Sequence, residues 1–285
     1  MTKLRLILCF ILFAPLCISA QKSIRIWDGT DMTRKQKWSK LTVFLPETPD
    51  TSGISVVICP GGSYYWMDRD NEGYSVAKYL NQHCIAAFVL QYRTARKGNH
   101  HPAMIEDLER AMYLVKQNAG KYKINPEKLG VMGFSAGGHL VGTQAIYSDT
   151  RFLDARHKTD VSLKPYFAAM IYPVVTMTNE EIVHKKSREN LLGKQYSPEM
   201  AEKMSLEKNV VTNMPPFFLL HCKNDQTVDY HNSVVFSTIL TEKDNPHKFL
   251  LFDECGEKGH GFGIQPIGEA AGWIDVFISW VLSIE

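Results

Sequence analysis

Residues 128–146 read KLGVMGFSAGGHLVGTQAI, and this stretch decides the fold class. Lys128–Phe134 is predicted to form a short apolar strand, and Ala136–Ile146 is predicted to form a helix. Between them, Gly133–Gly137 is a G-x-S-x-G pentapeptide with Ser135 at its centre. This setting is typical of a serine nucleophile, because a tight strand-to-helix turn presents the side chain and the flanking glycines avoid a clash. The alternative is a plain glycine-rich turn with a capping serine.

Strand and helix patterns alternate along the chain from about residue 54 onward. Continuous apolar runs are typical of central parallel strands that are covered on both faces. The predicted strands are Ser23–Trp27, Lys40–Leu45, Ile54–Cys59, Ile85–Leu90, Lys128–Phe134, Phe167–Tyr172, Phe217–His221 and Lys248–Phe252. The predicted helices are about Gly73–Gln82, His101–Ala119, Ala136–Ile146, Val234–Leu240 and Ile274–Leu282. This order predicts an α/β fold with a mostly parallel central sheet, helices on both faces and an antiparallel edge from the two early strands.

Residues 173–214 interrupt this alternation. The segment is polar, is long for a simple connection, and has Pro173, Pro198 and Pro215 in or beside it. Long insertions in compact domains often serve as lids. We therefore expect residues 21–285 to form one domain in which 173–214 is a small cap over the carboxyl edge of the sheet.

Residues 1–20, MTKLRLILCFILFAPLCISA, are typical of a secretory signal peptide. Two cations precede an apolar run, Leu6–Phe13, and the small residue Ala20 ends the segment. The alternative is a membrane anchor, but this run is short for about 30 Å of hydrocarbon. We expect cleavage, a periplasmic or secreted location, and no stable membrane span afterwards.

Four cysteines follow the predicted signal: Cys59, Cys84, Cys222 and Cys255. An exported protein can pair its cysteines, but the first three lie in apolar runs, where free cysteine behaves as a small hydrophobe. The prediction is buried thiols rather than a disulfide framework. The sequence has no C-x-x-C motif, and neither a metal site nor a cofactor is expected.

The charge balance excludes one class of partner. The chain has 32 Lys and Arg against 30 Asp and Glu. Because Lys3 and Arg5 belong to the predicted signal and no acidic residue does, the remainder is neutral. Nucleic-acid binding needs a clustered basic surface, so we expect no nucleic-acid partner. A neutral chain also suits an uncharged ester, for which steering by a net field has little effect.

A serine nucleophile needs a base and an acid that orients the base. In this fold the chain order is serine, acid, histidine. Asp225 follows the strand Phe217–His221, and His260 follows the strand Lys248–Phe252, so both are expected at strand ends. Asp229 is the alternative acid, although its place before a helix suits the helix dipole.

Rival histidines have other expected roles: His221 is predicted to be a core or supporting residue, and His139 to pack within its helix.

The oxyanion hole needs two backbone amides directed at the developing charge. One is expected at Ala136, directly after the nucleophile, and the other in the loop after Ile54–Cys59. Either Gly62 or Ser63 is the expected donor there, and a plain glycine turn is the alternative.

The sequence resembles the α/β-hydrolase superfamily and, within it, bacterial secreted carbohydrate esterases of the acetyl xylan esterase and feruloyl esterase kind. The matching stretches are CPGGSYYW (59–66), EGYSVAKYL (72–80), FVLQYR (88–93), HPAMIEDLERA (101–111), GVMGFSAGGHL (130–140), SRENLLG (187–193), PPFFLLHCKNDQTV (215–228) and GHGFG (259–263). One departure is Ser63, where many members have a third glycine, and it leaves the second oxyanion donor open.

The resemblance implies that SRENLLG faces the site, where Arg188 and Asn190 either contact a sugar or only anchor the cap. Tyr64, Tyr65 and Trp66 are expected either to form an aromatic platform for a sugar ring or to pack in the core. The implied function is removal of acetyl groups from plant cell-wall polysaccharide. The alternatives are a feruloyl esterase, a serine peptidase of the prolyl-oligopeptidase type, and a non-catalytic carbohydrate-binding protein.

Overall fold

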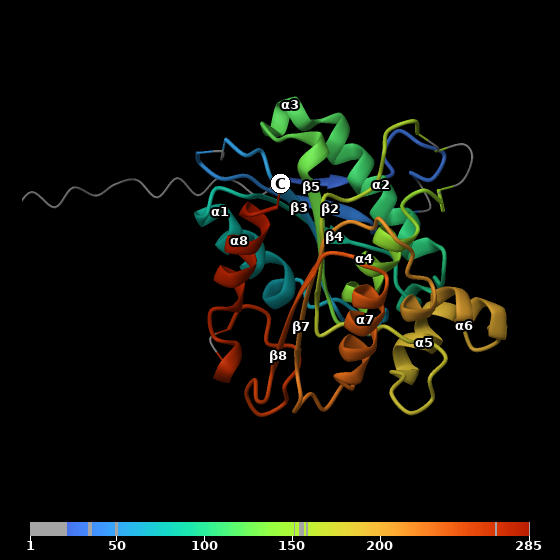
Figure 1. Cartoon of the computed structure of the whole chain (residues 1–285). Helices are drawn as coiled ribbons and strands as arrows, with labels where there is room; N and C mark the ends of the chain where they lie inside the picture. The colour runs from blue at the N-terminus through green and yellow to red at the C-terminus, as the bar shows by residue number, and fades with distance from the viewer. Residues whose placement is uncertain are drawn as a thin grey trace, which may run out of the picture.

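The computed structural model describes residues 22–33, 36–48, 51–150, 152–153, 157, 159–265 and 267–284. The predicted signal peptide, residues 1–20, lies outside the described residues. Within them, the centre of the molecule is an eight-stranded sheet of order β1-β2-β4-β3-β5-β6-β7-β8 (Figure 1). The strands are β1 Lys22–Arg25, β2 Lys40–Phe44, β3 Ser55–Cys59, β4 Ala86–Gln91, β5 Leu129–Phe134, β6 Ala168–Ile171, β7 Phe217–Cys222 and β8 His247–Phe252.

Strands β4, β3, β5, β6, β7 and β8 run parallel, whereas β1 and β2 pair antiparallel at one edge. The predicted antiparallel edge and parallel centre are therefore confirmed. Because the carboxyl ends of parallel strands meet at one edge, the loops after β3, β5, β7 and β8 are brought together there.

Helices cover both faces of the sheet (Figure 1). They are α1 Val76–Gln82, α2 Ala103–Gln117, α3 Ala119–Tyr122, α4 Ala136–Ile146, α5 Lys185–Leu192, α6 Pro198–Met204, α7 His231–Glu242 and α8 Trp273–Leu282. The predicted helix at 73–82 is divided, because a π-helical turn, Asp70–Ser75, precedes α1. The predicted helix at 234–240 is longer, since α7 begins at His231.

The core has two parts, one on each face of the sheet. Side chains of α2, α4 and α7 pack on one face, and those of α1 and α8 pack on the other. Successive strand residues alternate between the two parts: Phe217 and Leu219 belong to the first, whereas Phe218 and Leu220 belong to the second. Both faces of β7 are thus apolar, which is why its sequence reads as a continuous apolar run.

Residues 173–214 connect β6 to β7 and contain α5, α6 and a 3₁₀ turn, Leu206–Lys208. Helices α5 and α6 lie beside each other, away from the sheet and on the α7 side (Figure 1). The segment is tied to the domain by His139 in α4, whose Nε2 is 2.7 Å from the Met204 carbonyl oxygen. It is also tied by Asn190, whose amide donates to the Ser63 carbonyl oxygen at 2.8 Å.

The expectation of free thiols is wrong for two of the four cysteines. Cys222 at the end of β7 and Cys255 after β8 form a disulfide, with Cα atoms 5.9 Å apart. Cys222 ends an apolar run and Cys255 lies in a polar stretch, so the sequence does not suggest that they pair, but the parallel pairing of β7 and β8 brings the two positions together. Cys59 is a buried free thiol, and Cys84 is a partly exposed one.

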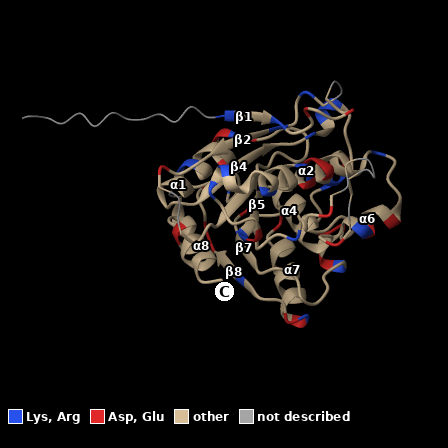
Figure 2. Cartoon of the chain, turned by 90° about the horizontal axis from the view of Figure 1, so that it is seen from above, with Lys and Arg blue, Asp and Glu red and all other residues tan. Residues whose placement is uncertain are grey.

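Positions occupied by Lys or Arg and by Asp or Glu are interspersed along the outer helices and loops (Figure 2). No helix within the described part of the chain is long and apolar enough to cross a membrane.

Candidate active site

Ser135 occupies the turn between β5 and α4. Its backbone has φ 53° and ψ −119°, and its side chain is almost fully buried. Two glycines make this turn possible: a Cβ at Gly137 would overlap the Cys59 carbonyl oxygen, and one at Gly133 would overlap the Gly137 carbonyl oxygen. The Ser135 amide donates to the Ile171 carbonyl oxygen at 2.9 Å, so the end of β6 fixes the strained turn.

The structure joins Ser135, His260 and Asp225 in one chain of hydrogen bonds. His260 Nε2 lies 3.0 Å from Ser135 Oγ, and His260 Nδ1 lies 2.7 Å from Asp225 Oδ2. Because a carboxylate only accepts hydrogen bonds, His260 Nδ1 carries the proton and Nε2 is left to accept one from Ser135. This is the arrangement that activates a serine hydroxyl as a nucleophile.

Asp225 is held by more than His260. Its Oδ1 accepts the backbone amides of Thr227 at 2.8 Å and Val228 at 2.9 Å, and its Oδ2 also lies 3.1 Å from His221 Nε2. Burial acts to raise the pKa of Asp225, but hydrogen bonds from His221 and His260 outweigh burial and keep that pKa below its ordinary value. Asp225 therefore stays ionised and fixes the orientation of His260.

His221 supports this carboxylate from inside the core. Its Nε2 faces two acceptors, Asp225 Oδ2 and the Val228 carbonyl oxygen at 3.0 Å, so Nε2 is the protonated nitrogen. Its Nδ1 then accepts from the Ser233 hydroxyl at 2.7 Å. The sequence predicted a core or supporting role for His221 but gave no sign of its partner.

Asp229, the alternative acid, is placed elsewhere. Its Oδ1 accepts the His231 amide and lies 2.8 Å from His231 Nδ1, at the start of α7. Its side chain is 43% exposed, whereas that of Asp225 is fully buried. Asp229 thus belongs to the helix terminus, as its position in the sequence indicates.

The loop after β3 carries the second group of expected amides. The Gly62 carbonyl oxygen accepts the amides of Tyr65 at 2.9 Å and Trp66 at 3.1 Å, which closes the loop into a tight turn. Within the described part of the chain, the amides of Gly62, Ser63 and Ala136 donate to no acceptor. Both candidate donors of the loop therefore have an amide without an acceptor, as Ala136 does.

Glu72 lies beneath this loop and was not found from the sequence. It is buried in the π-helical turn, where its Oε2 accepts the Gly61 amide at 2.7 Å and its Oε1 accepts the Tyr172 hydroxyl at 2.9 Å. Tyr172 in turn accepts the Gly263 amide at 3.1 Å and packs against the His260 ring at 4.6 Å between centroids. Glu72 therefore connects the loop after β3 with the loop that carries His260.

Burial raises the pKa of Glu72 to about 7. The only signal in the sequence is its place in the stretch EGYSVAKYL, which does not distinguish a buried glutamate from a helical surface residue.

The predicted substrate-contacting residues separate into two groups. Tyr64 has no exposed surface and its hydroxyl is 2.8 Å from His139 Nδ1, so the expectation of a sugar platform is wrong for Tyr64. Tyr65 and Trp66 are 44% and 50% exposed.

The two candidates in α5 serve as anchors. Arg188 is buried, donates to the Met177 carbonyl oxygen at 3.0 Å and pairs with Glu180. Asn190 holds the Ser63 carbonyl oxygen through its side chain, and its own carbonyl oxygen lies 2.8 Å from His100 Nδ1. These contacts favour the anchoring interpretation over direct contact with a sugar.

Within the described residues, no group of three or more His, Cys, Asp or Glu side chains is placed to hold a metal ion. The functional groups that the structure brings together here are the side chains of Ser135, His260 and Asp225.

The doubly covered parallel sheet, with a serine at the β5–α4 turn and its histidine and aspartate after β8 and β7, defines the α/β-hydrolase fold. A sequence model of the BD-FAE family matches residues 41–240, and the chain belongs to this family.

Individual relatives agree with this assignment. The chain is 31% identical over 232 residues to an acetylxylan esterase of Xylanibacter ruminicola, a match that covers 79% of this chain and 44% of the relative. It is 34% identical over 205 residues to endo-1,4-beta-xylanase B of Butyrivibrio fibrisolvens, covering 71% of this chain and 32% of that one. The chain thus spans less than half the length of these relatives.

Among solved structures, an acetyl ester-xyloside bifunctional hydrolase from Caldicellulosiruptor lactoaceticus superimposes with a TM-score of 0.82 at 28% identity, covering 92% of this chain and 96% of that one. A thermophilic esterase from Thermogutta terrifontis superimposes with a TM-score of 0.71 at 19% identity, covering 86% and 89% of the two chains, and at that identity shows the fold alone. The expected α/β-hydrolase fold and family resemblance are confirmed.

Proposed function

We propose that this chain is a serine carboxylester hydrolase that removes acetyl groups from plant cell-wall polysaccharide. The observation that carries the proposal is the line Ser135–His260–Asp225, with distances of 3.0 Å and 2.7 Å between successive members. Similarity to an acetylxylan esterase and to an acetyl ester-xyloside hydrolase supports the acetyl group and the glycan.

The proposed reaction proceeds through an acyl-enzyme. Ser135 Oγ attacks the acetyl carbonyl carbon while its proton passes to His260 Nε2. The amide of Ala136, with that of Gly62 or Ser63, stabilises the oxyanion. The tetrahedral intermediate then collapses, and His260 returns the proton to the sugar oxygen as the C–O bond breaks.

Water completes the cycle. His260 Nε2 removes a proton from a water molecule that attacks the acetyl-Ser135 carbonyl, and collapse of the second intermediate releases acetic acid and restores the serine hydroxyl. Asp225 stabilises the imidazolium in both halves of the reaction without itself taking the proton. No step needs a metal or an organic cofactor.

Two assays test the proposal. Hydrolysis of 4-nitrophenyl acetate by the wild type and by Ser135→Ala tests the nucleophile, and an undiminished rate in the variant would overturn it. Acetate release from a panel of acetylated polysaccharides, beside ferulate release from feruloylated oligosaccharides, tests the acyl group. Preferential ferulate release would indicate a feruloyl esterase, and cleavage of aminopeptide substrates but not acetyl esters would indicate a peptidase.

We further propose that residues 1–20 are removed on export and that residues 21–285 act as one domain with 173–214 as its cap. The disulfide Cys222–Cys255 supports export, because disulfides persist mainly in oxidising compartments. N-terminal sequencing of the exported protein tests the cleavage site, and an N-terminus at Met1 would contradict it.

A further inference from the structure

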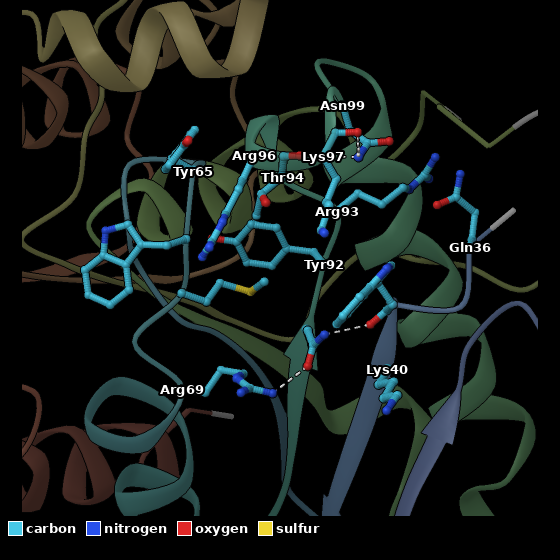
Figure 3. Close-up of a pocket in the computed structure, with 14 residues that line it drawn as sticks. Gln36, Lys40, Tyr65, Arg69, Tyr92, Arg93, Thr94, Arg96, Lys97 and Asn99 are labelled. Carbon is cyan, nitrogen blue, oxygen red and sulfur yellow. Dashed lines mark hydrogen bonds between the residues drawn. The ribbon is translucent and has the colours of Figure 1, made fainter.

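A groove of about 740 Å³ lies at the carboxyl end of β4. Its lining comes from three segments, residues 36–40, 65–69 and 91–99 (Figure 3). We call it the basic groove, because five cations line it and none of its described lining residues is Asp or Glu. The cations are Lys40, Arg69, Arg93, Arg96 and Lys97.

Four of these cations have charge available for a ligand. Arg93 is neutralised inside the protein, since its Nη2 lies 2.8 Å from Glu106 and 2.9 Å from Asp107. The other four form no ion pair within the described part of the chain. Among the same residues, the Arg69 side chain donates to the Gln91 amide oxygen at 2.6 Å and to no carboxylate, so its guanidinium is positioned without being neutralised (Figure 3).

Three aromatic rings are exposed at the same groove. Trp38, Tyr65 and Trp66 have 61%, 44% and 50% of their surface exposed, which makes them three of the most exposed large apolar side chains described. Lys97 Nζ lies 4.9 Å from the Trp38 ring centroid, so one cation already sits against an aromatic face. Large apolar rings gathered at one surface hollow mark a binding site, and a flat ring suits the apolar face of a sugar.

The groove and the reacting centre lie at the same edge of the sheet. Tyr65 and Trp66 directly follow the loop that presents Gly62 and Ser63, and their amides close that loop. Segment 91–99 leaves the carboxyl end of β4, and the sheet order places β4 next to β3 and β3 next to β5. Ser135 follows β5, so the groove and the nucleophile open at the same edge of the sheet, two strands apart.

We propose that the basic groove binds the acidic part of the substrate, an oligosaccharide that carries uronic acid carboxylates near the acetylated sugar. The inference rests on the proposed function, because it assigns a substrate class to the same site. Arginine matches a carboxylate with two parallel donors, and the aromatic rings hold the sugar that bears it. An uncharged glycan would use the rings but would leave four cations without a partner.

The experiment compares a matched pair of substrates. One is an acetylated xylo-oligosaccharide with glucuronic acid branches. The other is the same material after its carboxyls are reduced to alcohols, with both re-acetylated to equal acetyl content. The wild type is expected to show kcat/KM at least tenfold higher on the acidic member at 25 mM salt, and this preference is expected to shrink at 250 mM salt.

Replacing cations of the basic groove then tests whether the preference for the acidic substrate arises there. In Arg96→Gln/Lys97→Gln, the ratio of kcat/KM on the acidic member to that on the neutral member is expected to fall about tenfold, which is the effect of losing two exposed ion pairs. The matched control, Lys121→Gln/Lys243→Gln, removes two cations from α3 and the end of α7, outside the groove lining, and is expected to keep the wild-type ratio.

Binding to Ser135→Ala separates this inference from the proposed reaction. By calorimetry, the deacetylated acidic oligosaccharide is expected to bind at least tenfold more tightly than its reduced form. Equal affinity for the acidic and the reduced oligosaccharide would overturn the groove assignment. An equal fall in the acidic-to-neutral kcat/KM ratio in the groove variant and in the control would also overturn it. Tighter binding of the acidic oligosaccharide to Ser135→Ala, together with no acetate release by the wild type from either acetylated substrate, would support the groove assignment and reject acetyl hydrolysis.

Discussion

Replacement of Asp225 by Asn tests the catalytic arrangement most directly, because it changes one oxygen to an amino group and little else. Asp225 Oδ1 accepts two backbone amides, whereas Oδ2 faces His260 and His221. The asparagine oxygen must stay with the two amides, since an amino group there would oppose two N–H donors. The new amide NH2 group therefore faces His260 Nδ1, which has to give up its proton, and it also replaces the acceptor of His221 Nε2, whose hydrogen bond to this position is lost.

This exchange turns His260 into the wrong tautomer. With Nδ1 accepting, Nε2 carries the proton and no longer accepts one from the Ser135 hydroxyl 3.0 Å away. Loss of the orienting carboxylate in such triads lowers kcat about 10⁴-fold, which corresponds to about 5.5 kcal/mol of barrier at 1.36 kcal/mol per decade. We expect this loss in kcat for 4-nitrophenyl acetate, with KM changed little because Asp225 does not touch the substrate.

Asp229→Asn is the matched control. It makes the same chemical change four residues away, at an exposed carboxylate whose hydrogen bonds among the described residues are with His231. Its kcat is expected to stay within about fivefold of wild type, since exposed pairs contribute about 1 kcal/mol or less. An Asp225→Asn enzyme that folds and retains more than about a tenth of wild-type kcat would show that Asp225 does not set the tautomer of His260.

Three further changes probe the groups around the triad. His221→Phe removes one donor from Asp225 and should lower kcat about tenfold, since a hydrogen bond to a charged group contributes about 1.5 kcal/mol; steady-state kinetics with an unchanged kcat would contradict this role. Burial raises the pKa of Glu72 from 4.5 to about 7, so its contribution to stability is present below pH 4.5 and is lost as the pH rises through 7. Relative to Glu72→Gln, the wild type should therefore lose about 3 kcal/mol of unfolding free energy between pH 4 and pH 8 in urea titrations, and parallel pH profiles would refute it. Replacing both Cys222 and Cys255 by Ala opens a loop with a sequence separation of 33 and should cost about 3–4 kcal/mol, measured by urea unfolding under oxidising conditions, where an unaltered midpoint would be the contrary result.

The sequence predicted the parts of the site that local chain geometry determines. Gly133–Gly137 carries its own turn, because the glycines that avoid a clash are neighbours of Ser135. Asp225 and His260 follow apolar runs, and the ends of parallel strands meet at one edge wherever such runs occur. These positions could therefore be placed near one another without knowledge of any side-chain contact.

The parts that sequence reasoning missed depend on contacts between distant segments. Tyr64 lies next to the exposed Tyr65 and has the same type of side chain, but only Tyr64 reaches His139 in α4. Glu72 has its partners at Gly61, in the loop after β3, and at Tyr172, directly after β6. Neither composition nor periodicity distinguishes such residues from their neighbours, because the distinction arises only when the sheet brings the loops together.

The net charge of the chain, which the sequence gives, likewise does not reveal how charges are distributed over the surface. That distribution matters for the choice of substrate. The neutrality of residues 21–285 excludes a far field, because a net charge of zero attracts nothing beyond the screening length of about 10 Å. Net neutrality does not describe the charge of any one surface, however. The basic groove gathers four unneutralised cations from three separate segments. A polyanion such as nucleic acid needs an extended basic surface, whereas positions of both signs are interspersed along the ribbon in the view of Figure 2. A glycan with sparse carboxylates needs only one such groove, so a neutral composition is compatible with a glycan of this kind.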